Sequence, residues 1–457
     1  MVKRRRWKSK LQVRGVIMKK VVKFGGSSLA NAEQFQKVGD IIRSDESRRY
    51  VVPSAPGKRF DEDIKVTDML YGCYDAASKG EDITEKINAI KARYYEIIKG
   101  LGLSLSLEEE FKKIDEDFRA QAGIQYAASR GEFLNGKIMA AYLGYDFVDA
   151  ASVIRFDKAG NLEAEETNKL LSKKLSKSQH AVIPGFYGAC ADGTVKTFSR
   201  GGSDVTGSLV AKAIHADIYE NWTDVSGILM ADPRIVENPR PIERITYNEL
   251  RELSYMGAQV LHEASVFPVR QADIPLNIRN TNDPGHPGTL IREHFEDELE
   301  SEKNRFITGI AGRRNFSIIT MAKNGLSSSI GSLRRVLEVF ERHNLNVEYT
   351  PSGIDSVSLV VQSGKAASCL YSILGELQKE FRPDKLQVAE NISIVAAVGR
   401  KMAFRPGISG KIFAALGENG ISIRMISQGP EELNIIVGVD NADFEKTVRV
   451  LYESFVR

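Results

Sequence analysis

The last third of the chain repeats itself, and this repeat restricts the fold more than any other feature of the sequence. Gly331 and Gly407 lie 76 positions apart, and Gly353 and Gly429 have the same separation. Between the paired glycines the apolar residues keep their phase without a gap, first at helical and then at strand spacing. Two unrelated helix–strand units are the alternative, but they would not share both glycines and the apolar phase. The repeat therefore predicts two small α+β modules in tandem.

The first part of the chain, from Met18 to about residue 292, alternates short apolar runs with amphipathic stretches. This alternation is typical of an α/β domain with a mostly parallel, open sheet and helices on both faces. Residues 21–24 are a predicted strand that ends at two glycines, and Asn31 then fits the N-cap of a helix. Further predicted elements are strands at 50–52, 147–148 and 181–183 and a charged helical insertion at 79–121.

The composition of the chain shifts at two further points, which we take as boundaries. We expect the α/β domain to cover residues 18–292, an acidic linker to cover 293–304 and the repeated region to cover 305–457. Within the repeated region, the first module is predicted at about 314–380, and the second at about 391–457 together with a strand at about 305–312.

The distribution of charge separates the first 17 residues from the rest. The net charge is +3, but residues 1–17 hold seven basic and no acidic side chains, which leaves −4 for residues 18–457. A mildly acidic body argues against a nucleic-acid partner, and no apolar run approaches the roughly 18 residues of a membrane span. Three scattered cysteines without a CxxC pair favour a reducing, cytoplasmic compartment. We expect Met18 to be the native initiator and the basic tail 1–17 to lie outside the native protein.

The first candidate site is a glycine turn after the first predicted strand, residues 23–28 with the sequence KFGGSS. A strand that ends in two glycines presents backbone N–H groups to an anion. Lys23 would add an ammonium at the strand end, where open α/β sheets bind their ligands. A tight turn with a satisfied lysine explains the same residues equally well.

A second glycine segment, residues 199–207 with the sequence SRGGSDVTG, precedes another amphipathic stretch. Two such segments in one sheet predict a phosphate held from two sides. Arg200 offers a planar guanidinium suited to a carboxylate or a phosphate. Asp204, taken alone, is expected to be the N-cap of the helix that follows.

Several familiar catalytic motifs do not occur in the sequence. There is no GxxxxGK[ST] P-loop and no GxGxxG or HRD of protein kinases. There is no HExxH zinc motif and no GxSxG of esterases. The two glycine segments therefore need another explanation.

Taken in order along the chain, the motifs resemble those of the aspartokinase family. The segments that carry the likeness are KFGGSS at 23–28, SRGGSDVT at 199–206, WTDVSGI at 222–228, ADPR at 231–234 and GAQVLH at 257–262. The match runs from about residue 19 to the end, and the repeated modules resemble the paired ACT domains of that family. The nearest type is monofunctional and lysine-sensitive, because no dehydrogenase follows the second module.

This resemblance implies an amino-acid-kinase fold over residues 18–292, followed by the two ACT modules. It also implies transfer of the γ-phosphoryl group of ATP to the β-carboxylate of L-aspartate, with Mg²⁺ as a cofactor and without a metal site built by the protein alone. The product, 4-phospho-L-aspartate, leads to lysine, threonine and methionine. The carboxylate is already a nucleophile, so catalysis must come from positioning and from neutralising charge.

The resemblance also assigns roles to single residues in binding aspartate and in catalysis. Lys23 would lie on the phosphoryl oxygens, and Asp204 would hold Lys23 or the metal-bearing assembly in place. Arg200 is expected at the α-carboxylate and Glu132 at the α-ammonium, although composition alone favours an exposed carboxylate at Glu132. The further aspartate contacts implied are Ser54, Thr67 and Ser203.

The nucleotide contacts implied by the resemblance include one departure from the family pattern at Gln259, where many aspartokinases have Lys. Arg234, Arg270 and Lys196 are the candidates to supply the missing charge. At Leu229 a related enzyme type carries an aromatic residue. The full set of implied contacts is Lys23, Gly25, Gly26, Ser27, Gly201, Gly202, Thr223, Asp224, Leu229, Asp232, Arg234, Gln259 and Val260.

The ACT modules imply feedback regulation and assembly. We expect L-lysine to bind as allosteric inhibitor at the first module, and the chain to form a homodimer or homotetramer through these modules. Glu348 would oppose the extra ammonium of lysine, and the alternative is a solvated strand residue. The allosteric residues implied are Leu326, Ser329, Glu348 and Ser352.

Two other functions remain open at this point. The first is another amino-acid kinase that acts on acetylglutamate, glutamate or a nucleotide, but those kinases lack tandem ACT modules. The second is a catalytically inactive amino-acid sensor. Lys23, Arg200 and Asp204 are all present, which weighs against a sensor that has lost its catalytic residues.

Overall fold

The computed structural model describes residues 18–199, 201–258, 261, 263–296, 306–400, 402, 406–429 and 433–456. They form two compact units. The first comprises the described residues up to Ile228 and those of Leu261–Glu293, and the second comprises those of Leu229–Val260 and from His294 onward. The segment 229–260, which the sequence places in the α/β domain, thus packs with the second unit. The predicted domain boundaries stay predictions, and the basic tail lies outside the described residues.

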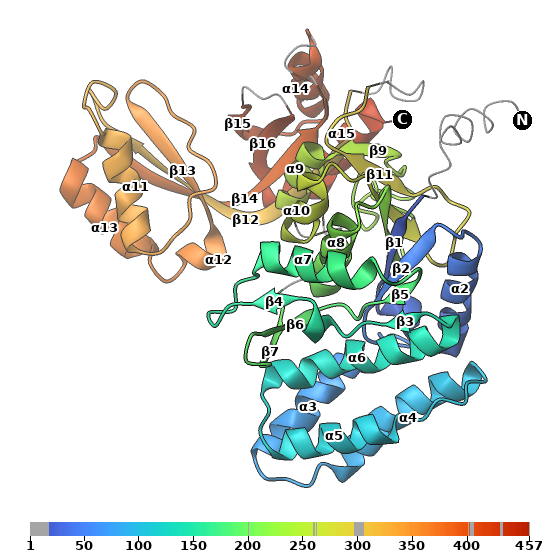
Figure 1. Ribbon diagram of the computed structural model, residues 1–457. Coiled ribbons are helices and arrows are strands. Elements are labelled where there is room, and N and C mark those ends of the chain that lie inside the picture. Colours follow the sequence, from blue (N-terminus) through green and yellow to red (C-terminus); the bar gives the residue numbers. More distant parts are fainter. Residues whose placement is uncertain are drawn as a thin grey trace, which may run out of the picture. The chain divides into compact units, whose positions relative to one another are not determined.

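An open sheet lies at the centre of the first unit (Figure 1). Its strands pair in the order β3-β5-β2-β1-β8-β10-β11, and all of these pairings are parallel except that of β10 with β11. The strands predicted at 21–24, 50–52, 147–148 and 181–183 are all present in it. The bounds are β1 Lys20–Phe24, β2 Arg48–Pro53, β3 Asp146–Phe147, β5 Ala181–Val182, β8 Ile218–Thr223, β10 Leu276–Asn280 and β11 Thr289–Arg292.

Helices cover both faces of this sheet, as predicted. Asn31 caps the first long helix by accepting a hydrogen bond from the backbone of Gln34. The predicted insertion at 79–121 folds as two helices, α4 and α5, whose apolar residues join the core under α2, α3 and α6. The helices are α2 Ala32–Arg43, α3 Val66–Ser78, α4 Thr84–Gly100, α5 Glu108–Arg119, α6 Ile124–Leu143, α7 Ala164–Leu175, α8 Gly202–Ala213 and α10 Glu263–Gln271; a small sheet adds β4 Arg155–Phe156, β6 Tyr187–Cys190 and β7 Val195–Thr197.

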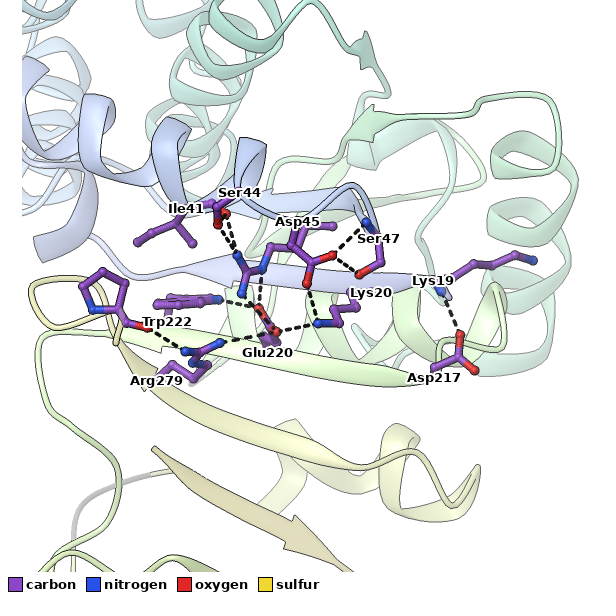
Figure 2. A network of polar contacts seen from close by, with 12 residues as sticks. Lys19, Lys20, Ile41, Ser44, Asp45, Ser47, Asp217, Glu220, Trp222 and Arg279 are labelled. Carbon is purple, nitrogen blue, oxygen red and sulfur yellow. Dashed lines mark hydrogen bonds and ion pairs between the residues drawn. The ribbon is translucent and has the colours of Figure 1, made fainter. Parts of the chain in front are cut away.

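A buried cluster of charges links the four central strands of the sheet (Figure 2). Glu220 of β8 is 2% exposed and accepts hydrogen bonds from Arg48 Nε at 2.8 Å and Trp222 Nε1 at 2.9 Å. Lys20 Nζ and Arg279 Nη1 lie 3.4 and 3.8 Å from the same carboxylate. Burial alone would raise the pKa of Glu220, but the charges of Arg48 and Lys20 hold it below its ordinary value. The cluster fixes β1, β2, β8 and β10 against one another.

The second unit contains the repeat as one continuous sheet, in the order β13-β12-β14-β16-β15. Helices α11 and α14 begin 76 positions apart, at Ser332 and Ile408. Gly331 and Gly407 are their N-caps, with φ of +75° and +87°, a region that side chains other than glycine rarely adopt. The repeated glycines are therefore explained by backbone geometry.

The modules differ from the predicted tandem in two respects. Strands β12 and β14 run through both copies and pair from Gly309 with Val398 to Ala322 with Lys385, so the modules share one sheet. The strand expected after α11 is reduced to isolated bridges, whereas the second copy forms β15 at the matching place. The elements of this unit are β9 Arg244–Thr246, α9 Tyr247–Tyr255, β12 Gly309–Ala322, α11 Ser332–Arg342, β13 Ser356–Gln362, α12 Ser363–Ala366, α13 Leu370–Phe381, β14 Lys385–Val398, α14 Ile408–Glu418, β15 Ile423–Ser427, β16 Asn434–Asp440 and α15 Phe444–Phe455. In the described part of the chain, none of the helices combines the length and apolarity needed to cross a membrane.

Candidate active site

The predicted site residues of the first unit gather at the carboxyl ends of β1, β2 and β8. These three strands are adjacent and parallel, so their ends meet at one edge of the sheet. Gly25 follows β1 and its N–H donates to the carbonyl of Trp222 at 3.0 Å. Ser54 follows β2 and its N–H donates to the carbonyl of Phe24 at 3.1 Å. This edge is where open α/β sheets bind ligands.

Lys23 stands at this edge in a hydrogen-bonded triangle. Its Nζ lies 2.6 Å from Asp204 Oδ1 and 3.3 Å from Asn221 Oδ1, and Asn221 Nδ2 donates to Asp204 Oδ1 at 2.9 Å. Lys23 is only 9% exposed. An ammonium has three N–H donors, and these two side chains are its partners within the described residues. One donor is left for a ligand, so the lysine is both held in place and available.

The two glycine segments present backbone N–H groups to the same edge. The amides of Gly26 and Ser27 make no hydrogen bond to another part of the described chain. Helix α8 begins at Gly202, and its first-turn amides lack partners within the helix. Its N-cap is Gly201, with φ of +55°, and not Asp204 as the sequence predicted. Asp204 lies in the first turn, where its carboxylate turns to Lys23 and Asn221 instead of the helix end.

Glu132 of α6 lies close to the predicted aspartate contacts. A Cβ built on the preceding Gly131 would lie 2.8 Å from Ala55 Cβ and 3.8 Å from Thr67 Oγ1, so α6 packs tightly against the loop after β2 and the start of α3. Glu132 itself is 6% exposed, which overturns the exposed position that composition favours. Ser203 at the start of α8 is also buried, beside Gly185.

The Glu132 carboxylate is short of partners. Its Oε2 has no hydrogen bond within the described chain. Burial raises the pKa of Glu132 to about 8, although the backbone N–H of Ala55 and the charge of Arg130 lower it. A buried carboxylate costs free energy until a cation pairs with it. The geometry thus suits a ligand that carries an ammonium group.

The remaining predicted contacts, mostly to the nucleotide, do not all lie in the first unit. Thr223 and Asp224 follow β8, and Thr223 Oγ1 donates to Asp224 Oδ1 at 3.1 Å. Asp232 and Arg234 form a pair at 2.6 Å. Together with Leu229 they belong to the second unit. Outside the described residues lie Arg200, Gln259 and Val260.

Three cations are candidates to replace the lysine missing at Gln259. Arg234 is paired with Asp232, and Arg270 with Glu293 at 2.9 Å. Within the described residues no partner holds the ammonium of Lys196 on β7. The structure thus leaves Lys196 as the candidate whose charge is not already matched by a carboxylate.

Two residues that the sequence reasoning missed support the site. Asn221 completes the triangle with Lys23 and Asp204, and Asn135, which is fully buried, donates from Nδ2 to the carbonyl of Ser54 at 2.6 Å. Asn221 had a signal in the sequence, since it is a polar residue directly before the WTDVSGI segment at 222–228. Asn135 had none, because it lies inside a long helix.

In the ranges that the structure describes, no three His, Cys, Asp or Glu residues gather where they could hold an ion. Mg²⁺ in phosphoryl-transfer sites usually takes only one or two carboxylates and completes its shell with phosphates and water. The carboxylate of Asp204 fits that pattern.

A pocket of about 310 Å³ opens in the first module, between the segment before α11 and the start of β13. Three of the four predicted allosteric residues line it: Leu326, Ser329 and Ser352. Glu348 does not line it. Its carboxylate accepts a hydrogen bond from Tyr255 of α9 and lies 3.6 Å from Arg313 Nη1, with 6% of the side chain exposed. Glu348 is therefore a buried, paired carboxylate rather than a solvated strand residue.

Comparison with known proteins identifies the families to which the two parts of the chain are similar. The family described as amino acid kinase family matches residues 18–280, and an ACT domain matches residues 395–455. The fold and the site thus define an amino acid kinase with ACT modules.

Individual relatives show which kind of amino acid kinase this chain resembles. Aspartokinase 3 of Bacillus subtilis is 36% identical over 453 residues, which cover 95% of this chain and 98% of that protein. The solved aspartate kinase of Clostridium acetobutylicum is 48% identical with a TM-score of 0.87, over 96% of this chain and all of that one. Aspartokinase III of Escherichia coli, solved with aspartate and ADP, is 27% identical with a TM-score of 0.72, over 96% of this chain and all of that one. The chain belongs to the aspartokinase family, and it is an aspartate kinase; the predicted family and fold class are confirmed.

Proposed function

We propose that this aspartate kinase carries out phosphoryl transfer from ATP at the edge formed by the ends of β1, β2 and β8. The observation that carries the proposal is the triangle in which Asp204 and Asn221 hold Lys23, at 2.6 and 3.3 Å, with one N–H left over. A fixed ammonium that needs no reorganisation stabilises charge on a transferring phosphoryl group. ATP as donor is supported by the E. coli relative, which was solved with ADP.

Phosphoryl transfer to a carboxylate requires that the substrates be positioned, and it requires no general base to remove a proton. The β-carboxylate of aspartate is already ionised at neutral pH, so it attacks the γ-phosphorus directly, and the bond from that phosphorus to the β,γ-bridging oxygen breaks. Lys23 neutralises charge on the equatorial oxygens of the transferring group. The amides of Gly26, Ser27 and Gly202 face the phosphates from two sides.

Aspartate is held at the α6 side of this edge. Glu132, buried with an unpaired oxygen, accepts the α-ammonium. Ser54, Thr67 and Ser203 line the same region, and Arg200 is the proposed partner of the α-carboxylate. A site that pairs each charge of a zwitterion with a fixed opposite charge rejects acceptors that lack the ammonium.

The same edge of the sheet supplies proposed contacts to the nucleotide and to Mg²⁺. Thr223 and Asp224, directly after β8, are proposed nucleotide contacts, as are Leu229, Asp232, Arg234, Gln259 and Val260 of the segment that follows. Bound Mg²⁺ would supply positive charge that offsets the negative charge of the phosphates. Asp204 is the carboxylate proposed to reach its coordination shell, while continuing to hold Lys23.

The pocket of the first module is the proposed effector site. It is lined by Leu326, Ser329 and Ser352, and the E. coli relative was solved with lysine and aspartate in its T-state. We propose L-lysine as the inhibitor, with coupling on the order of 1–3 kcal/mol. Because Glu348 is already paired with Arg313 and Tyr255, it would act on lysine only after those contacts change. Assembly into a dimer or tetramer through the modules, and a cytoplasmic location, stay predictions.

Trapping the product tests this proposal. The enzyme is incubated with ATP, Mg²⁺, L-aspartate and hydroxylamine, which converts an acyl phosphate into a hydroxamate. We expect the β-hydroxamate of aspartate, with one ADP for each hydroxamate. ADP formed without hydroxamate would mean that water, and not aspartate, accepts the phosphoryl group.

A further inference from the structure

The loop between β2 and α3, residues 54–65, is fastened to the helical insertion by one buried arginine. Arg93 of α4 is 5% exposed. Its Nη2 donates to the carbonyl of Gly57 at 3.0 Å, and its Nη1 donates to Asp63 Oδ2 at 2.9 Å and to the carbonyl of Ile64 at 3.3 Å. Three acceptors from two ends of one loop therefore converge on a single guanidinium.

The same loop rests directly on the first glycine segment. The N–H of Gly57 donates to the carbonyl of Gly26 at 2.8 Å. A Cβ on Gly57 would lie 2.6 Å from the carbonyl carbon of Gly26, and a Cβ on Gly26 would lie 2.9 Å from the carbonyl oxygen of Ala55. The two backbones touch without side chains between them. Any shift of Gly57 is thus passed to Gly26 and to the neighbouring Ser27.

Arginine suits this place for a physical reason. Its planar fork offers several N–H donors in fixed directions, whereas an ammonium is a single point charge. A buried guanidinium is costly unless a carboxylate and further acceptors surround it. Asp63 supplies the charge, and its other oxygen, Oδ1, accepts a hydrogen bond from Arg59 Nη2 at 3.1 Å. The cluster fixes both ends of the loop, from Gly57 to Ile64.

We propose that Arg93 is a positioning residue for phosphoryl transfer. It fastens loop 54–65 against residues 25–27, so that the insertion helices set the distance between the aspartate contact Ser54 and the phosphate-facing amides. Arg93 itself contacts neither substrate. This inference rests on the proposed assignment of Ser54 and of Gly25–Ser27 to the two substrates.

The first test compares Arg93→Met with Arg119→Met. Arg119 lies on α5 of the same insertion and also pairs with a carboxylate, Asp115 at 3.1 Å, but half of its side chain is exposed. Steady-state kcat and KM for ATP and aspartate are measured on protein whose far-UV circular dichroism matches the unchanged enzyme. Since a misplacement of about 1 Å can cost about 100-fold, we expect kcat/KM to fall about that much for Arg93→Met and to stay unchanged for Arg119→Met. Arg93→Lys should recover part of the loss, because it keeps the charge on Asp63.

A double-mutant cycle separates positioning from a general loss of stability. Gly57→Ala disturbs the contact with Gly26 while the Arg93 side chain stays in the protein. If both substitutions act through the same contact, their effects on kcat/KM should not multiply. The double variant Arg93→Met/Gly57→Ala should then have about the same kcat/KM as the more impaired of the two single variants. Arg93→Lys replaces Arg93→Met in the cycle if the latter does not fold.

The results that would overturn the role of Arg93 differ from the result that would overturn the assignment of the site. Kinetic constants of folded Arg93→Met within twofold of those of Arg119→Met would overturn the inference, as would fully multiplicative effects in the cycle. A Lys23→Met variant serves as a separate check on the site itself. If that variant kept full activity, the assignment of the site would be wrong, whatever Arg93 does.

Discussion

Replacing Glu132 by glutamine should make the enzyme more stable at alkaline pH and much weaker in binding aspartate. In the free enzyme Glu132 is buried, one oxygen has no partner, and burial raises its pKa from 4.5 to about 8. The folded state therefore holds this proton to a higher pH than the unfolded chain does. Stability from this group is fully present below about pH 4.5 and is lost as the pH rises to about 8.

The size of the effect follows from the two pKa values. A rise from 4.5 to about 8 corresponds to about 5 kcal/mol of lost stability once the carboxylate is fully ionised. Glutamine keeps the shape and cannot ionise. The thermal midpoint of Glu132→Gln should thus exceed that of the unchanged enzyme by several degrees at pH 8.5 and match it at pH 4.5. Exposed Glu109→Gln on α5 is the matched control and should change neither midpoint.

Binding should show the opposite trend with pH. If only the ionised carboxylate accepts the ammonium of aspartate, the competent fraction at pH 7 is about one tenth. The KM for aspartate should then fall about tenfold per pH unit between pH 6 and 8 and level off above. In Glu132→Gln this dependence should vanish and the KM should be at least tenfold higher at pH 8. A KM of the unchanged enzyme that is flat from pH 6 to 8, with equal midpoints at pH 8.5, would refute the reasoning.

Three further predictions concern other parts of the molecule. Lys23→Met and Asp204→Asn should each lower kcat by about 10²–10³-fold with little change in the KM for aspartate, as measured by coupled ADP release. Glu220→Gln should lower the free energy of unfolding by about 3–5 kcal/mol at pH 7. Because the pKa of Glu220 is depressed in the folded state, this loss should shrink below about pH 4.5. Denaturation in urea at both pH values measures the difference. Ser352→Leu, at an exposed rim of the module pocket, should raise the lysine concentration for half-inhibition at least tenfold without changing kcat, and an unchanged response to lysine would move the effector elsewhere.

The sequence predicted those features that depend on local patterns. The paired glycines 331 and 407 recur because each starts a helix with a positive φ, and such positions leave a mark in the sequence. The glycine turn after β1 and the helix cap at Asn31 are local as well. These parts of the fold and of the site could therefore be read from residue types and spacing.

Features that depend on distant contacts could not be predicted in this way. Asn221 meets Lys23 across 198 positions of sequence, and nothing near either residue specifies the pairing. Composition alone favours an exposed Glu132, because helix carboxylates usually are exposed, and the packing of α6 against the loop after β2 is what buries it. Asp204, taken alone, fits a helix cap, but Gly201 takes that position and the carboxylate of Asp204 pairs with Lys23.

The most direct measurement of the central claim is ADP release with L-aspartate, L-glutamate and acetylglutamate as separate acceptors, with Lys23→Met as the reference. We predict turnover with L-aspartate alone, an aspartyl β-hydroxamate in step with ADP, and a fall of both by about 10²–10³-fold in Lys23→Met. Turnover with glutamate or acetylglutamate that equals or exceeds that with aspartate, or turnover in Lys23→Met close to that of the unchanged enzyme, would contradict this assignment.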